Sequence, residues 1–147
     1  MTRKQYYDWV NVEAQTQDLL RQMRNEKFDA VVGLTRGGLT PAVLVSQYLD
    51  IPMHTLKISL RDHAGQESLD NLAQASSGCN KVLVIDDIND TGATINYIKN
   101  NWKLDNLTYA VLINNEASDA EVHYSSIDIN KMEDDVWIVF PWEDWWH

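Results

Sequence analysis

The stretch with the most evident chemistry is residues 82–94, where an apolar run leads directly into acidic and polar residues. The run Val82–Ile85 predicts a buried parallel strand. Two adjacent carboxylates, Asp86 and Asp87, follow it. Carboxylates repel phosphate and accept hydrogen bonds, so this pair is suited to vicinal hydroxyl groups or to a metal ion.

A polar loop and a predicted helix come directly after the acid pair. The loop spans 89–92, and the helical pattern opens near Ala93. Backbone N–H groups at a helix start, with the hydroxyls of Thr91 and Thr94, are suited to a phosphate monoester. Gly92 permits a close approach or a positive φ there. A sugar phosphate would satisfy the acids and the loop together.

A second glycine-rich turn stands between a predicted strand, 28–34, and a predicted helix, 42–49. Arg36 is the only fixed positive charge in this turn, and the neighbouring glycines, Gly37 and Gly38, leave the backbone open. Such a turn favours binding of an anion.

The order of the predicted elements indicates an α/β fold with a doubly wound, mostly parallel sheet flanked by helices. In such sheets ligands bind beyond the carboxyl ends of the strands. We therefore expect 35–38, 86–94 and 114–115 to converge within a single domain, 1–147. Further helices are expected at 8–24 and 95–102, and further strands at 51–59, 107–113, 127–129 and 134–142.

Composition restricts the partners of this chain. The 147 residues carry a net charge of −10, which argues against nucleic acid because phosphate backbones need a basic face. The lone Cys79 excludes an internal disulfide and fits a reducing compartment. No apolar run is long enough for stable membrane insertion, and no apolar leader is present. We expect a cytoplasmic protein.

Two segments stand outside this pattern. Residues 60–80 form a polar insert of the kind that often serves as a lid, in which His63 is interpreted as a solvated loop residue. Four of the six tryptophans fall within 137–146. Packing or a subunit contact explains most of them, while one exposed ring near a sugar phosphate site would offer a stacking face to a planar base.

Residues 85–94 resemble the phosphoribosyl pyrophosphate (PRPP) motif of the type I phosphoribosyltransferase family. The resemblance implies that Asp86 and Asp87 hold the ribose hydroxyls and that Asp87 also helps to bind Mg²⁺. It further implies that residues 90–94 (Asp90, Thr91, Gly92, Ala93 and Thr94) cradle the 5′-phosphate. Arg36 and Gly37 match the pyrophosphate loop, where relatives often carry a non-proline cis peptide. Residues 60–80 match a flap over PRPP.

From about residue 9 to residue 142 the chain is most similar to the xanthine-guanine branch of this family. By position, the resemblance implies that Trp137 covers the purine and that the backbone of Ile138 reads its 2-substituent, within a base-binding hood at 134–147. Asp90 corresponds to the acid near the purine imidazole, which is the implied catalytic residue.

Two positions depart from the family pattern. Asn115 stands where relatives have a lysine that reads the purine 6-oxo group, and an amide both donates and accepts hydrogen bonds, so a 6-amino purine stays open. Glu67 aligns with the flap arginine that grips pyrophosphate. Three explanations stay open: Arg61 or Lys57 substitutes for it, turnover is weak, or the alignment of this loop is shifted.

The resemblance implies an enzyme of purine salvage that transfers the phosphoribosyl group of PRPP to a guanine-, xanthine- or hypoxanthine-type base, as a homodimer or homotetramer. The alternative on the same fold is a non-catalytic PRPP or nucleotide sensor. Two other interpretations of 87–98 are an acidic surface turn and an EF-hand loop, although Ile98 would stand where that loop needs glutamate.

Overall fold

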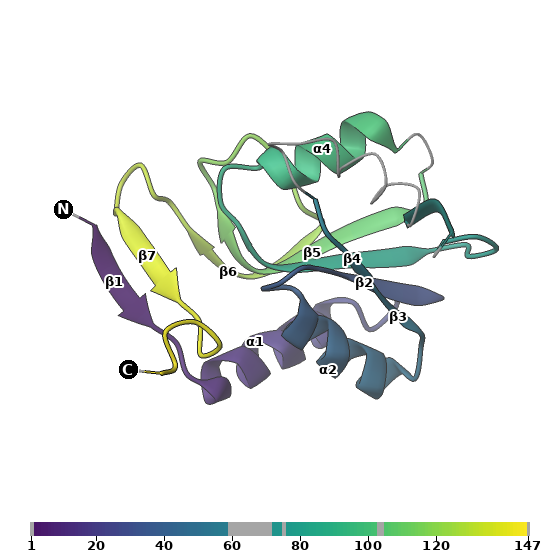
Figure 1. Cartoon of the computed structure of the whole chain (residues 1–147), viewed down its shortest axis with the longest axis horizontal. Helices are drawn as coiled ribbons and strands as arrows, with labels where there is room; N and C mark the ends of the chain where they lie inside the picture. Colours follow the sequence, from purple (N-terminus) through teal and green to yellow (C-terminus); the bar gives the residue numbers. More distant parts are fainter. Residues whose placement is uncertain (1, 59–71, 75, 103–104, 147) are drawn as a thin grey trace.

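The chain folds around a five-stranded sheet in which every strand is parallel to its neighbours (Figure 1). The computed structural model describes residues 2–58, 72–74, 76–102 and 105–146. The strand order β3-β2-β4-β5-β6 confirms the predicted parallel α/β sheet. In chain order the elements are β1 (Arg3–Tyr6), α1 (Trp9–Gln22), β2 (Ala30–Leu34), α2 (Leu39–Leu49), β3 (Met53–Leu56), β4 (Val82–Asn89), α4 (Ala93–Asn101), β5 (Leu107–Asn115), β6 (Tyr124–Ile129) and β7 (Val136–Val139).

Helices cover both faces of this sheet, with α1 and α2 on one side and α4 on the other (Figure 1). Successive strand residues point to opposite faces, and the core divides accordingly. Val31, Leu83 and Ile85 pack in the cluster that includes α1 and α2. Val32 and Val84 pack in the cluster that includes α4. Burial on both faces explains why the central strands are continuous apolar runs.

Helix α2 begins at Leu39, three residues earlier than the sequence predicted. The prediction placed Pro41 outside the helix. Proline is tolerated in the first turn because its missing N–H would have no partner there. The earlier start places the helix directly after the glycine-rich turn at 35–38.

Strand β4 is also longer than predicted, since it runs to Asn89. Asp86 pairs in register with Val111, and Asn89 with Asn114. The acid pair therefore lies inside the last part of the strand, and the EF-hand interpretation fails because extended backbone occupies the start of that loop. Strand β6 likewise begins at Tyr124 rather than at residue 127.

A separate two-stranded sheet, β1 with β7, forms the hood beside the main sheet. The sequence analysis placed only 134–147 in the hood and missed β1, whose four residues are polar or exposed. Aromatic rings join the hood to α1: Phe140 stacks on Trp142 with centroids 4.9 Å apart, and Trp142 lies 6.0 Å from Trp9. Within the described ranges, no helix combines the length and apolarity needed to cross a membrane.

Candidate active site

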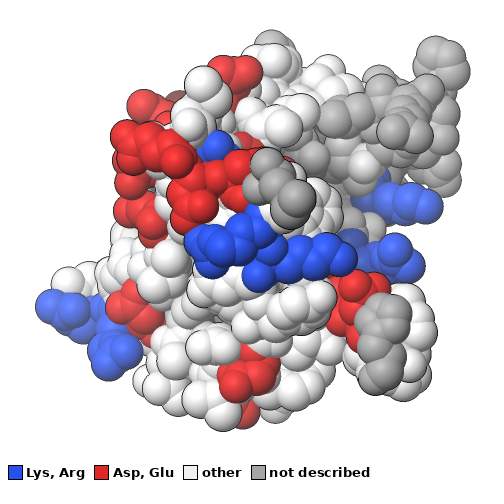
Figure 2. All heavy atoms as spheres, turned by 90° about the vertical axis from the view of Figure 1, so that its left-hand side faces the viewer, with Lys and Arg blue, Asp and Glu red and all other residues white. Residues whose placement is uncertain are grey.

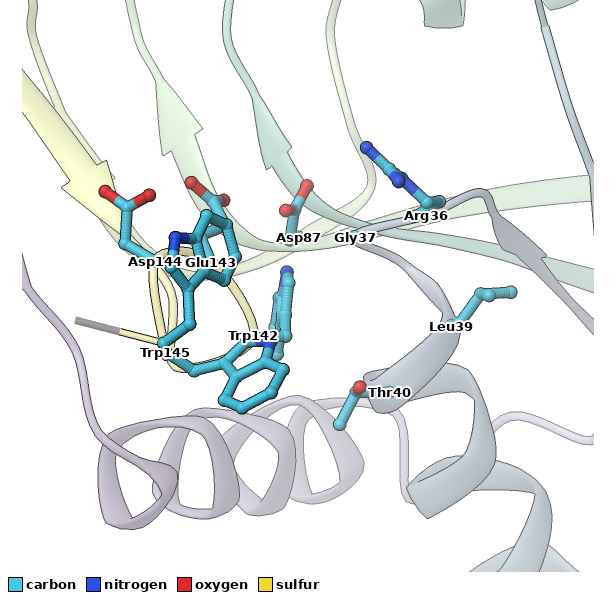
Figure 3. Close-up of a pocket in the computed structure, with 10 residues that line it drawn as sticks. Arg36, Gly37, Leu39, Thr40, Asp87, Trp142, Glu143, Asp144 and Trp145 are labelled. Atoms are coloured by element: carbon cyan, nitrogen blue, oxygen red, sulfur yellow. The ribbon is translucent and has the colours of Figure 1, made fainter.

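The turn that follows β2 opens onto a cleft at the carboxyl ends of the strands. Its volume is about 630 Å³, and Arg36, Gly37, Thr40 and Asp87 line it (Figure 3). The Thr35–Arg36 peptide is cis, as the family resemblance implied. Among the described residues Arg36 makes no ion pair, so its exposed guanidinium can bind an anion.

Gly37 packs directly against the acid pair. A Cβ atom at this position would lie 1.9 Å from Oδ2 of Asp87 and 2.3 Å from its Cγ. No real side chain tolerates such distances, so only glycine lets the turn and the Asp87 carboxylate share this space. The predicted convergence of the two loops is therefore confirmed.

The two acids lie half-buried at the floor of the site and are held by short local hydrogen bonds. Oδ1 of Asp86 accepts from the Asp87 N–H at 2.8 Å, and Oδ1 of Asp87 accepts from the Ile88 N–H at 2.7 Å. Burial and then the charge of Asp87 raise the pKa of Asp86 well above its usual value. Burial also raises the pKa of Asp87. Ionisation of these acids is therefore more costly in the ligand-free site than in water, and hydroxyl groups or a cation would offset this cost.

Replacing Asp86 with asparagine should stabilise the ligand-free protein at neutral pH. A carboxyl whose pKa is raised by folding destabilises the fold as pH rises through that pKa. The variant lacks this penalty, so its melting temperature should exceed that of the parent by a few degrees at pH 7 to 8. Thermal unfolding across pH 4 to 8 measures the difference, which should shrink toward acid pH. A difference that grows toward acid pH would contradict the assigned pKa direction.

The loop after β4 and the first turn of α4 form a second, smaller hollow. Its volume is about 100 Å³, and Asp86, Asp90, Thr91 and Thr94 are among its lining residues. Gly92 has a φ of +91°, and a Cβ atom there would lie 2.6 Å from the backbone nitrogen of Ala120. The turn thus requires glycine. The first N–H groups of α4 lack intrahelical partners, which makes this hollow suitable for a phosphate group.

The neighbouring loop at 114–120 supports the turn after β4, which lines the smaller hollow. The buried Asn89 amide donates to Oδ1 of Asn114 at 2.9 Å and to the Ala120 carbonyl at 3.0 Å. The N–H of Asp119 donates to the Thr91 carbonyl at 2.9 Å. Asn89 is therefore a structural residue that fixes the position of the turn.

A third hollow lies under the hood. It measures about 60 Å³, and Ile88, Asp90, Lys131, Trp137 and Ile138 are among its lining residues. Trp137 is half exposed, at 50%. The predicted purine residues Trp137 and Ile138 thus lie beside the predicted acid Asp90, and Trp137 offers an accessible aromatic face.

The side chain of Asn115, the predicted purine contact, lies outside the hood hollow. Its side chain is buried: Nδ2 donates to the Asp90 carbonyl at 2.9 Å, while Oδ1 accepts from Lys131 N–H at 3.0 Å and Ala117 N–H at 3.2 Å. These bonds tie three loops together, and the amide does not line the hood hollow. The side chain that does line it is that of Lys131, which the sequence analysis missed. One available signal was that Lys131 is the only lysine or arginine after residue 103.

The C-terminal tail supplies lining residues that the sequence analysis also missed. Trp142, Glu143, Asp144 and Trp145 face the Arg36 turn across the large cleft, and the carboxylates of Asp87, Glu143 and Asp144 point to one side of it (Figure 3). Burial and then the charges of Asp87 and Asp144 raise the pKa of Glu143. Figure 2 shows acidic side chains gathered on one face beside a band of basic ones. Bound cations would relieve this crowding of carboxylates.

The three hollows join into one site because they share lining residues. Glu143 lines both the large cleft and the hood hollow. Asp90 and Ile88 line both the hood hollow and the hollow between β4 and α4. The predicted flap residues Arg61, His63 and Glu67 lie outside the described residues, and Lys57 is exposed just after β3.

A family comparison agrees with this arrangement. The model of the phosphoribosyl transferase domain matches residues 2–144, nearly the whole chain. The chain belongs to this phosphoribosyltransferase family. The resemblance inferred from residues 85–94 is thereby confirmed, and the parallel sheet with its loops is the fold of a phosphoribosyltransferase.

Individual proteins extend the comparison. A xanthine-guanine phosphoribosyltransferase of Idiomarina loihiensis is 28% identical, over 96% of this chain and 88% of that protein. The crystal structure of a purine phosphoribosyltransferase from Pyrococcus horikoshii has a TM-score of 0.74 at 24% identity, covering 96% of this chain and 95% of that one. A Neisseria gonorrhoeae protein with bound ppGpp has a TM-score of 0.75 at 26% identity, covering 97% and 90%.

Proposed function

We propose that this phosphoribosyltransferase acts in purine salvage. It transfers the 5-phosphoribosyl group of PRPP to a ring nitrogen of a purine and releases pyrophosphate. The observation that supports this most strongly is the joining of three hollows of different chemistry. Asp87 lines the hollow of the arginine turn, Asp86 lines the hollow of the helix-start loop, and the hollow under the aromatic hood shares Glu143 with the first and Asp90 with the second. The similarity to a xanthine-guanine phosphoribosyltransferase favours a purine acceptor.

The proposed mechanism relies on positioning and on charge. The anomeric C–O bond breaks as pyrophosphate leaves, and the ring nitrogen of the base forms the new bond to the same carbon. Arg36 and the Gly37 backbone bind the leaving pyrophosphate, while the loop at 90–94 anchors the 5′-phosphate. Asp86 and Asp87 hold the ribose hydroxyls. Asp90 takes or shares the imidazole proton as the new bond forms.

The residues present also fit Mg²⁺. This ion keeps several waters and is usually bound through one or two carboxylates together with substrate phosphates. Asp87 offers such a carboxylate next to the anion-binding turn. No group of three or more candidate protein ligands occurs in the described ranges, so the diphosphate would complete the coordination. When bound, Mg²⁺ would neutralise charge that develops on the pyrophosphate.

A direct assay tests the function. Purified protein with PRPP and Mg²⁺ is offered guanine, xanthine, hypoxanthine and adenine in turn, and pyrophosphate release and nucleotide formation are followed. We expect release with at least one oxopurine, and omission of Mg²⁺ should abolish it. Absence of release with every base, under conditions where PRPP binds, would overturn the proposal of an enzyme.

A nucleotide-binding regulatory protein is the second candidate. It is favoured by the similarly folded Neisseria gonorrhoeae protein, which carries bound ppGpp. Calorimetry with ppGpp and with PRPP separates the candidates, because a sensor binds such ligands without turnover. We further propose a cytoplasmic protein that assembles as a homodimer or homotetramer, which light scattering would test.

A further inference from the structure

Lys131 is the cation of the hood hollow. Its Nζ lies 3.0 Å from Oδ1 of Asp90 and 5.4 Å from the centroid of the Trp137 ring. The side chain is only 18% exposed, whereas that of Asp90 is 41% exposed. The ammonium is thus held at a fixed place between the acid and the aromatic face.

The backbone of Lys131 is held as firmly as its side chain. Asn115 accepts the Lys131 N–H at 3.0 Å and donates to the Asp90 carbonyl at 2.9 Å. Asn115, which aligns with the family's base-reading lysine, therefore holds the backbone of Lys131 in place. Position 115 lacks the family's lysine. Lys131, in the loop before β7, instead brings a cation to the hood hollow.

The chemistry of purines decides what an ammonium at this place can recognise. The imidazole nitrogen N7 and the 6-substituent lie on the same edge of the ring. At the 6-position an oxopurine presents an acceptor, while adenine presents an amino donor. Lysine only donates hydrogen bonds. A base that lies on Trp137 with its imidazole edge toward Asp90 therefore brings its 6-substituent toward Lys131.

We propose that the Lys131 ammonium reads the 6-oxo group of the purine and so makes this phosphoribosyltransferase select 6-oxo over 6-amino purines. The inference rests on the proposed purine function and settles the question that Asn115 left open. The hollow of about 60 Å³ is much smaller than typical ligand pockets of about 300–1,000 Å³. Lys131 consequently moves off the Trp137 face when a base enters, and its hydrogen bond to the base replaces the ring contact.

The test compares Lys131→Met with the parent on two bases that differ at the 6-position, hypoxanthine and adenine. We expect the parent to prefer hypoxanthine. The variant should lower the ratio of kcat/KM for hypoxanthine to that for adenine by about 10- to 100-fold, the usual effect of losing a hydrogen bond to a charged group. The loss should fall on the KM for hypoxanthine, and the KM for PRPP should not change. Lys131→Arg should retain most of the preference.

Lys99→Met is the matched control. Lys99 also lies over an aromatic ring, 5.3 Å from the centroid of Tyr109, and it bonds the Glu121 carbonyl far from the hood. This variant should keep the parent ratio. If Lys131→Met acted only through Asp90 or through stability, kcat/KM would fall by the same factor for hypoxanthine and for adenine, and the ratio would not change. An unchanged ratio, or a parent that prefers adenine, overturns the inference.

Product binding keeps the two proposals separable. Calorimetry with inosine and adenosine monophosphates needs no turnover, and Lys131→Met should weaken binding of the inosine nucleotide alone by about 10- to 100-fold. A parent that binds with this selectivity but transfers no phosphoribosyl group would refute the enzyme and retain the role of Lys131. If the parent shows turnover but Lys131→Met binds the inosine nucleotide as tightly as the parent does, the enzyme is supported and the role of Lys131 is refuted.

Discussion

Asp87→Asn is expected to lower kcat/KM for PRPP by about 1000-fold while the fold is retained. The carboxylate lies against the anion-binding turn, and it is the proposed contact for both a ribose hydroxyl and Mg²⁺. An amide keeps the size but loses the charge, so stabilisation that develops in the transition state is lost. Pyrophosphate release at saturating base, with PRPP and Mg²⁺ varied separately, measures the effect.

The matched control for this variant is Asp50→Asn. Asp50 ends α2 in the left-handed conformation, with φ of 54°, which asparagine adopts readily. Its activity should equal that of the parent. Because burial raises the pKa of Asp87, Asp87→Asn should also melt no lower than the parent at neutral pH. A fully active Asp87→Asn protein would refute the assignment of this carboxylate to PRPP.

Gly37→Ala is expected to lower kcat/KM for PRPP by at least about 100-fold through displacement of a neighbouring residue. The added methyl group would meet the Asp87 carboxylate at 1.9 Å, so this carboxylate must turn away from the cleft. A misplacement of about 1 Å in a catalytic group can cost about 100-fold in rate. Steady-state kinetics measure the loss.

Two variants show whether the effect passes through Asp87. In an Asp87→Ala background the methyl group has room, so Gly37→Ala should lower the melting temperature less than it does in the parent, a coupling that a double-mutant cycle detects. Gly78→Ala is the converse control: Gly78 has φ of +77° and open space around it. Its substitution should cost stability by strain, and this cost should be the same in the Asp87→Ala background as in the parent. Equal losses of melting temperature in both backgrounds would argue against the steric explanation.

The parts of the site that the sequence predicted are those encoded locally. The acid pair at the end of strand β4, the turn and the start of α4 follow one another within a few residues, so residue types and spacing were sufficient to predict them. The same holds for the turn at 35–38 after β2. Parallel topology then required these turns to meet, because carboxyl ends of parallel strands share one edge of the sheet.

The parts that were missed depend on contacts between distant residues. Strand β1 is short and polar, and it is held by partners such as Asp134, 131 residues away from Arg3. Such a strand has no hydrophobic alternation to indicate it. Lys131 was missed for a similar reason, because alignment compares positions along the chain, while this cation reaches the hood hollow from a loop that does not align with position 115.

The pairing of β1 with β7 also bears on folding. The strands of the main sheet all lie between residues 30 and 129, so this sheet can form without β1 or β7. Strand β1 pairs with residues 136–139, and this contact must close a loop that contains most of the chain, which makes it intrinsically slow. The proposed base-binding wall therefore depends on a late contact, and a chain that has already collapsed around its core is not yet able to choose a substrate.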